Sequence, residues 1–154
     1  MGYESLLRAA EREGVDVYER TMRPAIKGLY GDNVIWINRF LPTTAEKGCV
    51  LAEELGHYHT TSGDILDQQQ LENRRQEKRA RNWAYEKLVP LSGIVRAYQA
   101  GVKGRFELAE HLDVIEDFLE QAIKHYREKH GRLAVFEGKY IIYFDPLGVA
   151  EMFE

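Results

Sequence analysis

The segment spanning residues 45–60 constrains the fold more than any other part of this sequence. Its small residues recur every three or four positions, which places them on one side of an α-helix. A stripe of small side chains lets a second element approach the helix backbone closely, so we expect this helix to lie at the centre of the fold. The stripe consists of Ala45, Cys49, Ala52 and Gly56.

Sequence signals at both ends define this helix. Thr43 is followed three positions later by Glu46, which is the spacing of a capping box. Ser62-Gly63 should end the helix, because glycine readily adopts the left-handed conformation common at helix C-termini. We therefore predict one helix that begins at this Thr-Glu pair, passes through His57 and ends near Gly63.

Hydrophobic periodicity predicts the remaining elements, and their order indicates an α+β fold. Helical spacing covers residues 3–13, 71–88, 91–100, 106–112 and 116–129, and Pro90 ends the second of these helices. Strand-like runs cover residues 15–18, 26–30, 34–38, 134–136 and 140–144. The second and third of these runs form one predicted hairpin, and the last two form another. The order of helix, hairpin, helices and hairpin is typical of the α+β class.

The length, charge and cysteine content favour a single cytoplasmic domain. A chain of 154 residues can bury one hydrophobic core, so we expect one domain over 1–154, with a candidate-site region 1–92, a helical region 93–130 and a hairpin region 131–154. The net charge of −4 gives no general reason to expect a nucleic acid partner. The lone Cys49 cannot form an internal disulfide. Since we see neither a leader peptide nor an apolar run of about 18 residues, we predict a cytoplasmic protein without a membrane span.

The central helix also carries a candidate metal site. Residues 53–57, Glu-Glu-Leu-Gly-His, have the frame of the His-Glu-x-x-His signature of zinc proteases, with Glu53 in place of the first His. Residues four apart share a helix face, so Glu53 and His57 would hold a metal together. Glu54 would act as the general base that takes a proton from the attacking water. A carboxylate on an enclosed face is costly unless it is paired or bound to a cation.

Glu77 is the best candidate for the third protein ligand that a catalytic metal site needs. It lies on a helical stripe that is otherwise apolar and should face the core. The rest of this stripe consists of Ala80, Ala84 and Leu88. With Glu53 and His57, the ligand set would carry two negative charges, which shifts the preference somewhat from zinc toward manganese. We predict a zinc site, with manganese as the alternative.

Other interpretations of these residues stay open. A Glu-Glu-x-x-His pattern occurs often by chance on the solvated face of a helix. His59 points to a different face from His57, so we expect it behind the ligands or at the surface. If the site acts on a peptide, an exposed edge of the first hairpin, at residues 34–38, would hold that peptide as an added strand.

Two motifs together resemble those of the ImmA/IrrE family of metallo-endopeptidases. Residues 51–57, Leu-Ala-Glu-Glu-Leu-Gly-His, resemble the family's Leu-Ala-His-Glu-Leu-Gly-His segment. Residues 77–84, Glu-Lys-Arg-Ala-Arg-Asn-Trp-Ala, and 87–90, Lys-Leu-Val-Pro, follow the frame of its Glu-x-x-Ala-Asn-x-Phe-Ala and Leu-Leu-Met-Pro motif. Residues 63–67 and 140–148 are similar to the phage and prophage branch. The resemblance places Glu77 at the family's third ligand.

This resemblance implies a zincin-like, gluzincin-type helical domain and regulated proteolysis. Members of the family typically cleave a partner repressor that carries a helix-turn-helix DNA-binding domain and is often encoded beside them. Such cleavage derepresses a phage, a mobile element or a stress regulon. Because Glu53 departs from the family pattern, the alternative is a catalytically weak or inactive binding module that regulates a repressor by association.

Residues 106–129 have the periodicity of a helix-turn-helix pair. A DNA reader presents basic or amide side chains on its second helix, whereas this one begins Glu116-Asp117 and adds Glu120, which would repel phosphates. We therefore favour a protein-docking or structural role over direct DNA binding. The predicted core of the pair consists of Leu108, Ala109, Leu112, Val114, Phe118, Leu119 and Ala122.

A basic cluster lies on the predicted helix at residues 71–88. Acidic residues are interleaved with it, so a solvated helix face is the commoner explanation, and steering of an acidic partner is the alternative. The cluster consists of Arg74, Arg75, Lys78, Arg79 and Arg81, and the interleaved acids are Glu72, Glu77 and Glu86.

Overall fold

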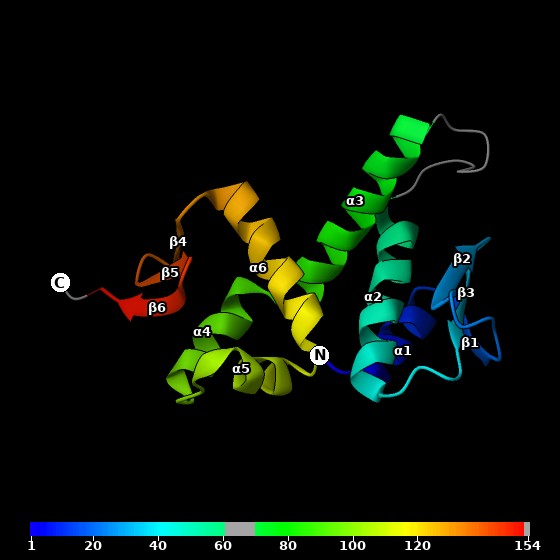
Figure 1. Ribbon diagram of the computed structural model, residues 1–154, viewed down its shortest axis with the longest axis horizontal. Coiled ribbons are helices and arrows are strands. Elements are labelled where there is room, and N and C mark those ends of the chain that lie inside the picture. The colour runs from blue at the N-terminus through cyan, green and yellow to red at the C-terminus, as the bar shows by residue number, and fades with distance from the viewer. Residues whose placement is uncertain (61–69, 153–154) are drawn as a thin grey trace.

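The fold is organised around two long helices that lie side by side and run in opposite directions, α2 (Thr44–Thr60) and α3 (Gln70–Leu88) (Figure 1). The computed structural model describes residues 1–60 and 70–152. A three-stranded sheet and α1 (Tyr3–Arg12) lie against α2, and the C-terminal half of the chain packs beyond α3. This arrangement confirms the predicted α+β class.

The first sheet has the strand order β1-β3-β2, formed by β1 (Asp16–Arg20), β2 (Gly28–Gly31) and β3 (Val34–Asn38). The predicted hairpin is confirmed, since β2 and β3 pair antiparallel. The prediction that residues 34–38 form an exposed edge is wrong, because β1 pairs parallel with β3 on its other side. Ile35 and Ile37 of β3 are fully buried, as suits a central strand that packs on a helix.

Asn38, at the end of β3, fixes the loop that leads into β2. Its side-chain Nδ2 donates hydrogen bonds to the carbonyl oxygens of Met22, Arg23 and Ile26, at 3.3, 3.2 and 2.9 Å. Its Oδ1 accepts a hydrogen bond from the backbone N–H of Phe40 at 3.1 Å. A buried amide with several partners orders the segment around it, so Asn38 sets the position of β2 beside α2.

The stripe of small residues allows the close packing of α2 that the sequence predicts. A Cβ added at Gly56 would lie 2.2 Å from the carbonyl oxygen of Ala80, so α3 crosses α2 in backbone contact at this point. The N-terminus of the helix is also confirmed, since the Glu46 N–H donates to Thr43 Oγ1 at 3.1 Å. The predicted stop at Ser62-Gly63 lies outside the described residues.

The C-terminal half continues with three helices and a second sheet. α5 (Gly104–Leu112) and α6 (Glu116–His130) form the predicted pair after α4 (Leu91–Gln99), and all seven predicted core residues of the pair are buried. The sheet is a meander of β4 (Leu133–Phe136), β5 (Tyr140–Phe144) and β6 (Leu147–Glu151). Strand β6 was not predicted, because its small residues give little strand signal.

One buried aromatic residue joins this half to the rest of the fold. The Tyr126 hydroxyl of α6 donates to the carbonyl oxygen of Val89 at 2.7 Å, and its ring stacks on Phe144 of β5. In the part of the chain that the structure describes, no helix combines the length and apolar character needed to cross a membrane.

We expect Gly56→Ala to lower the free energy of unfolding by about 1–3 kcal/mol, because the added methyl group forces α2 and α3 apart. Gly31→Ala is the matched control, since its Cβ would meet no described atom within 4 Å. Urea denaturation of both variants measures the difference. Equal stabilities would contradict the close helix crossing.

Candidate functional site

The residues that the sequence singles out line one pocket between α2, α3 and β2. The pocket has a volume of about 320 Å³. Gly28 of β2 lies directly on α2, since a Cβ added there would approach Val50 Cγ1 to 2.7 Å and Glu54 Cγ to 3.2 Å. The lining residues are Gly28, Leu29, Tyr30, Glu53, Glu54, His57, Glu77, Ala80 and Arg81. The four predicted site residues therefore come together, and strand β2 forms the third wall.

His57 and Glu77 are in contact across the helix pair. His57 Nε2 lies 3.3 Å from Glu77 Oε1, and the two side chains are 11% and 49% exposed. This separation suits two ligands of one tetrahedral zinc ion, whose donor atoms lie about 2.0–2.2 Å from the metal. The other ring nitrogen, His57 Nδ1, is buried and has no hydrogen-bond partner among the described residues. A zinc-bound histidine normally donates a hydrogen bond from this second nitrogen.

Glu53 is half-buried and shares its surroundings with Arg81 of α3. Both residues line the site pocket and a second hollow on the far side of Glu53. Burial raises the pKa of Glu53, whereas the positive charge of Arg81 lowers it, and the net direction is upward. Arg81 therefore supplies positive charge beside the carboxylate that was predicted to be the first metal ligand.

Glu54 lies against β2 and favours its protonated form. Burial, together with the negative charges of Glu53 and Glu77, raises the pKa of Glu54 to about 8. A general base must be deprotonated to accept a proton. Near pH 7 this raised pKa favours the neutral form of Glu54, whose carboxyl O–H is a hydrogen-bond donor.

His59 lies away from the pocket, as predicted. Its Nε2 is 2.9 Å from Glu13 Oε2 at the end of α1, and its ring stacks on Trp83 of α3 at a centroid distance of 4.6 Å. These contacts tie α2 to its two neighbouring helices. Glu86 of α3 also lies away from the pocket, since it pairs with His125 Nε2 at 3.0 Å and Lys129 Nζ at 2.9 Å on α6.

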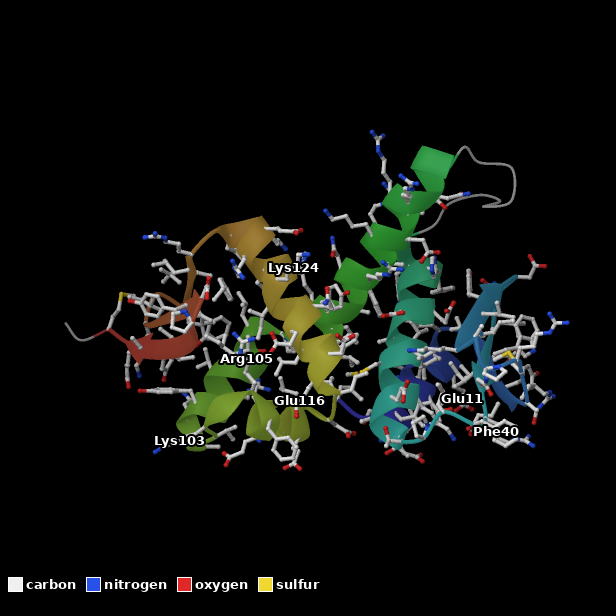
Figure 2. The ribbon with its side chains drawn as sticks, in the orientation of Figure 1. Glu11, Phe40, Lys103, Arg105, Glu116 and Lys124 are labelled. Carbon is white, nitrogen blue, oxygen red and sulfur yellow. The ribbon has the colours of Figure 1, made fainter. Side chains whose placement is uncertain are left out.

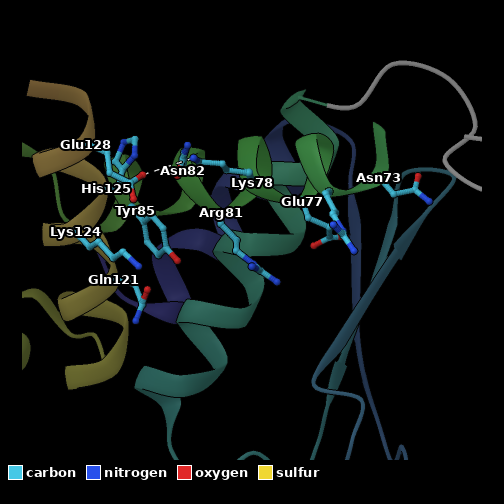
Figure 3. A pocket seen from close by; sticks show the side chains of 11 residues that line it. Asn73, Glu77, Lys78, Arg81, Asn82, Tyr85, Gln121, Lys124, His125 and Glu128 are labelled. Carbon is cyan, nitrogen blue, oxygen red and sulfur yellow. Dashed lines mark ion pairs between the residues drawn. The ribbon is translucent and has the colours of Figure 1, made fainter. Parts of the chain in front are cut away.

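Arg81 is the residue of the pocket whose place the sequence analysis missed. The basic cluster was interpreted as a solvated helix face, and Arg81 is indeed exposed, but it also borders Glu53. Figure 3 shows its side chain reaching from α3 across α2. The spacing in the sequence could have predicted this position, because Arg81 follows Glu77 by four residues and so shares its helix face.

A pocket of acidic residues and a histidine, on a helix pair beside a small sheet, defines a metallopeptidase-like protein. The IrrE N-terminal-like domain, Peptidase_M78, matches residues 10–124. The chain therefore belongs to this family, which confirms the resemblance found in its motifs. No curated protein matches the sequence significantly.

The family implies a divalent metal, typically zinc, but the residues present do not form a complete centre for one. Across the described residues, no group of three His, Cys, Asp or Glu side chains is placed to hold a metal ion. His57 and Glu77 supply two donors, whereas Glu53 lies beside Arg81, whose charge opposes a cation. The predicted ligands thus share a pocket without converging on one point.

We expect Glu54→Gln to stabilise the protein above pH 5. Between about 4.5 and about 8 the folded protein holds a proton on Glu54 that the unfolded chain has released, so stability falls as the pH rises through this window. The neutral amide removes that loss, which amounts to about 1–2 kcal/mol at pH 8 after allowing for solvent screening. Urea denaturation after chelator treatment, at pH 4.5 and pH 8, measures it. A gain that is the same at both pH values would contradict the raised pKa.

We expect Glu53→His to raise the zinc association constant by at least about tenfold, because an imidazole suits zinc and one competing carboxylate is removed. Titration calorimetry with zinc measures the change. Glu11→His is the control, since Glu11 is exposed on α1 (Figure 2). If both variants bind zinc equally well, position 53 does not face the metal.

Proposed function

We propose that this protein acts on an extended segment of a protein partner, held along the free edge of β2. The observation that carries the proposal is the position of this edge beside the pocket that contains Glu54, His57 and Glu77. Among the described residues, β2 pairs only with β3, so its other edge has no strand. An exposed edge strand of this kind accepts an added strand.

The hydrogen-bonding pattern identifies the groups that face outward on this edge. The Asn38 N–H donates to the Lys27 carbonyl oxygen at 2.9 Å, so Lys27 and Asn38 form a hydrogen-bonded pair. Such pairs alternate along antiparallel strands. Gly28 and Tyr30, which oppose Ile37 and Ile35, therefore direct their N–H and C=O groups away from β3.

The partner that the family resemblance supports is a helix-turn-helix repressor. Members of the family typically act on such proteins, which links the pocket to the control of a phage or mobile element. The acidic start of α6, Glu116-Asp117, supports action on the repressor itself and not on its DNA.

Association without cleavage is the outcome that the geometry supports best. Glu53 and Arg81 line the same pocket, and the positive charge of Arg81 acts on Glu53 and opposes a cation there. The neutral Glu54 and the free strand edge still suit a peptide backbone, which offers both donors and acceptors. The protein would then regulate the repressor by holding it.

Metal-dependent cleavage is the second candidate, and the contact between His57 and Glu77 favours it. Zinc or manganese, when bound, would polarise the scissile carbonyl. Glu54 would take the proton of the attacking water and deliver it to the leaving amine. This candidate requires Glu53 to join His57 and Glu77 as the third ligand.

The test incubates the purified protein with the helix-turn-helix repressor encoded nearest to its gene, with and without equimolar zinc. We expect an intact repressor that co-elutes in size-exclusion chromatography, with its mass unchanged in mass spectrometry. Two repressor fragments that disappear with Glu54→Gln would establish cleavage as the function. If the repressor neither co-elutes with the protein nor is cut into fragments, the proposal as a whole is contradicted.

Tyr30→Pro tests the strand edge directly. Proline removes the outward N–H of Tyr30 and is tolerated on edge strands, whereas Tyr30→Ala loses the same ring but keeps the N–H. We expect Tyr30→Pro to bind the repressor on the order of tenfold more weakly than Tyr30→Ala. Equal binding of the two variants would show that the partner does not pair with β2.

A further inference from the structure

Another hollow, distinct from the one beside Glu53 described above, opens between α3 and α6, next to the site pocket. It has a volume of about 500 Å³ and is called the α3–α6 groove below. Glu77 and Arg81 line both the groove and the site pocket, so the two are adjacent. A polypeptide held along β2 would therefore lie next to the groove.

The α3–α6 groove is positive in a protein whose net charge is −4. Four cations and two carboxylates line it, which gives a formal charge of +2 with His125 neutral. Figure 3 shows Lys124 reaching from α6 toward Tyr85 of α3, whereas Arg81 extends from α3 over α2. The cations are Arg74, Lys78, Arg81 and Lys124, and the carboxylates are Glu77 and Glu128.

Most of this positive charge is unpaired. Glu77 Oε1 lies 3.3 Å from His57 Nε2, and Glu128 Oε2 lies 3.6 Å from Lys78 Nζ, so both carboxylates have partners. The remaining three cations, Arg74, Arg81 and Lys124, form neither a hydrogen bond nor an ion pair with any residue that the structure describes, but the charge of Arg81 also acts on Glu53. Arg74 and Lys124 are therefore the cations available to an anion that enters the groove.

We propose that the α3–α6 groove binds an acidic stretch of the same polypeptide that lies along β2. The inference rests on the proposed function and adds the chemical class of the partner segment. A few cations on fixed helices are enough to bind the carboxylate side chains of such a stretch through charge-assisted hydrogen bonds. A nucleic acid backbone is disfavoured, because Glu77 and Glu128 line the groove and Glu116-Asp117 begin α6.

The experiment measures fluorescence anisotropy with two labelled peptides of equal length, a Glu-Ala repeat and a Gln-Ala repeat. We expect the Glu-Ala peptide to bind at least about tenfold more tightly at about 50 mM salt, and less tightly as salt rises. Lys124→Glu and Arg74→Glu should each weaken its binding about tenfold. Lys103→Glu is the matched control, because Lys103 is exposed at the start of α5, away from the groove (Figure 2).

Three results would overturn the inference. One is equal affinity for the two peptides, and another is an equal loss in Lys103→Glu and Lys124→Glu, which would reflect only overall charge. The third is an oligonucleotide that binds more tightly than the Glu-Ala peptide and depends in the same way on Lys124. That result would assign the groove to nucleic acid.

The test of the groove can fail independently of the test of the proposed function. Lys124 lies outside the site pocket, and Tyr30 lies outside the groove. If the repressor binds through β2 but Lys124→Glu leaves its affinity unchanged, only the acidic-segment inference fails. If Lys124→Glu weakens the Glu-Ala peptide while no repressor associates, the groove is real and the partner is a different acidic protein.

Discussion

The backbone contact between α2 and α3 at Gly56 and Ala80 is the constraint on which the rest of this structure depends. Because Gly56 has no side chain, α3 crosses α2 closely enough for Glu77, about one turn before Ala80, and Arg81, directly after it, to reach the same pocket. Glu77 meets His57 on one side, and Arg81 approaches Glu53 on the other. A larger residue at position 56 would separate all four side chains, although none of them touches it.

The pocket that this crossing creates brings together three carboxylates, and burying their negative charges away from water is energetically costly. Glu53, Glu54 and Glu77 lie together in a partly buried space, and such carboxylates must be neutralised by a proton, a basic side chain or a metal ion. The first two apply here, because the raised pKa of Glu54 favours its protonated form and the charge of Arg81 acts on Glu53. A metal would have to compete with both. The chemistry of the site is therefore a competition between cations for one set of carboxylates.

Local patterns in the sequence were enough to predict most of the fold. The stripe of small residues, the capping box and the strand alternation act over a few residues, so they identified α2, the first hairpin and the α5–α6 pair. The position of β3 at the centre of its sheet depends on β1, to which no local signal connects it. The pairing of Glu86 with His125 joins residues 39 positions apart and left no trace in the spacing.

The site could be predicted only in part for the same physical reason. Glu53, Glu54 and His57 share one helix, and Glu77 stands out on an apolar stripe, so their meeting in one pocket follows from helical geometry. Whether donor atoms converge on a point depends on side-chain rotamers and on neighbours from the other helix. The charge of Arg81 acts on Glu53 only because the packing of α2 against α3 brings both residues to one pocket.

The proposed function separates recognition from chemistry, because the two would use different parts of the same surface. The edge of β2 and the α3–α6 groove present backbone groups and cations that would bind a chain without reacting with it. The carboxylates and His57 lie between these two regions. Replacing the first ligand of a metal centre by Glu53 changes only the middle of this path. In the proposed function, a protein of this family would keep the whole surface that holds its partner even where a metal ligand is replaced.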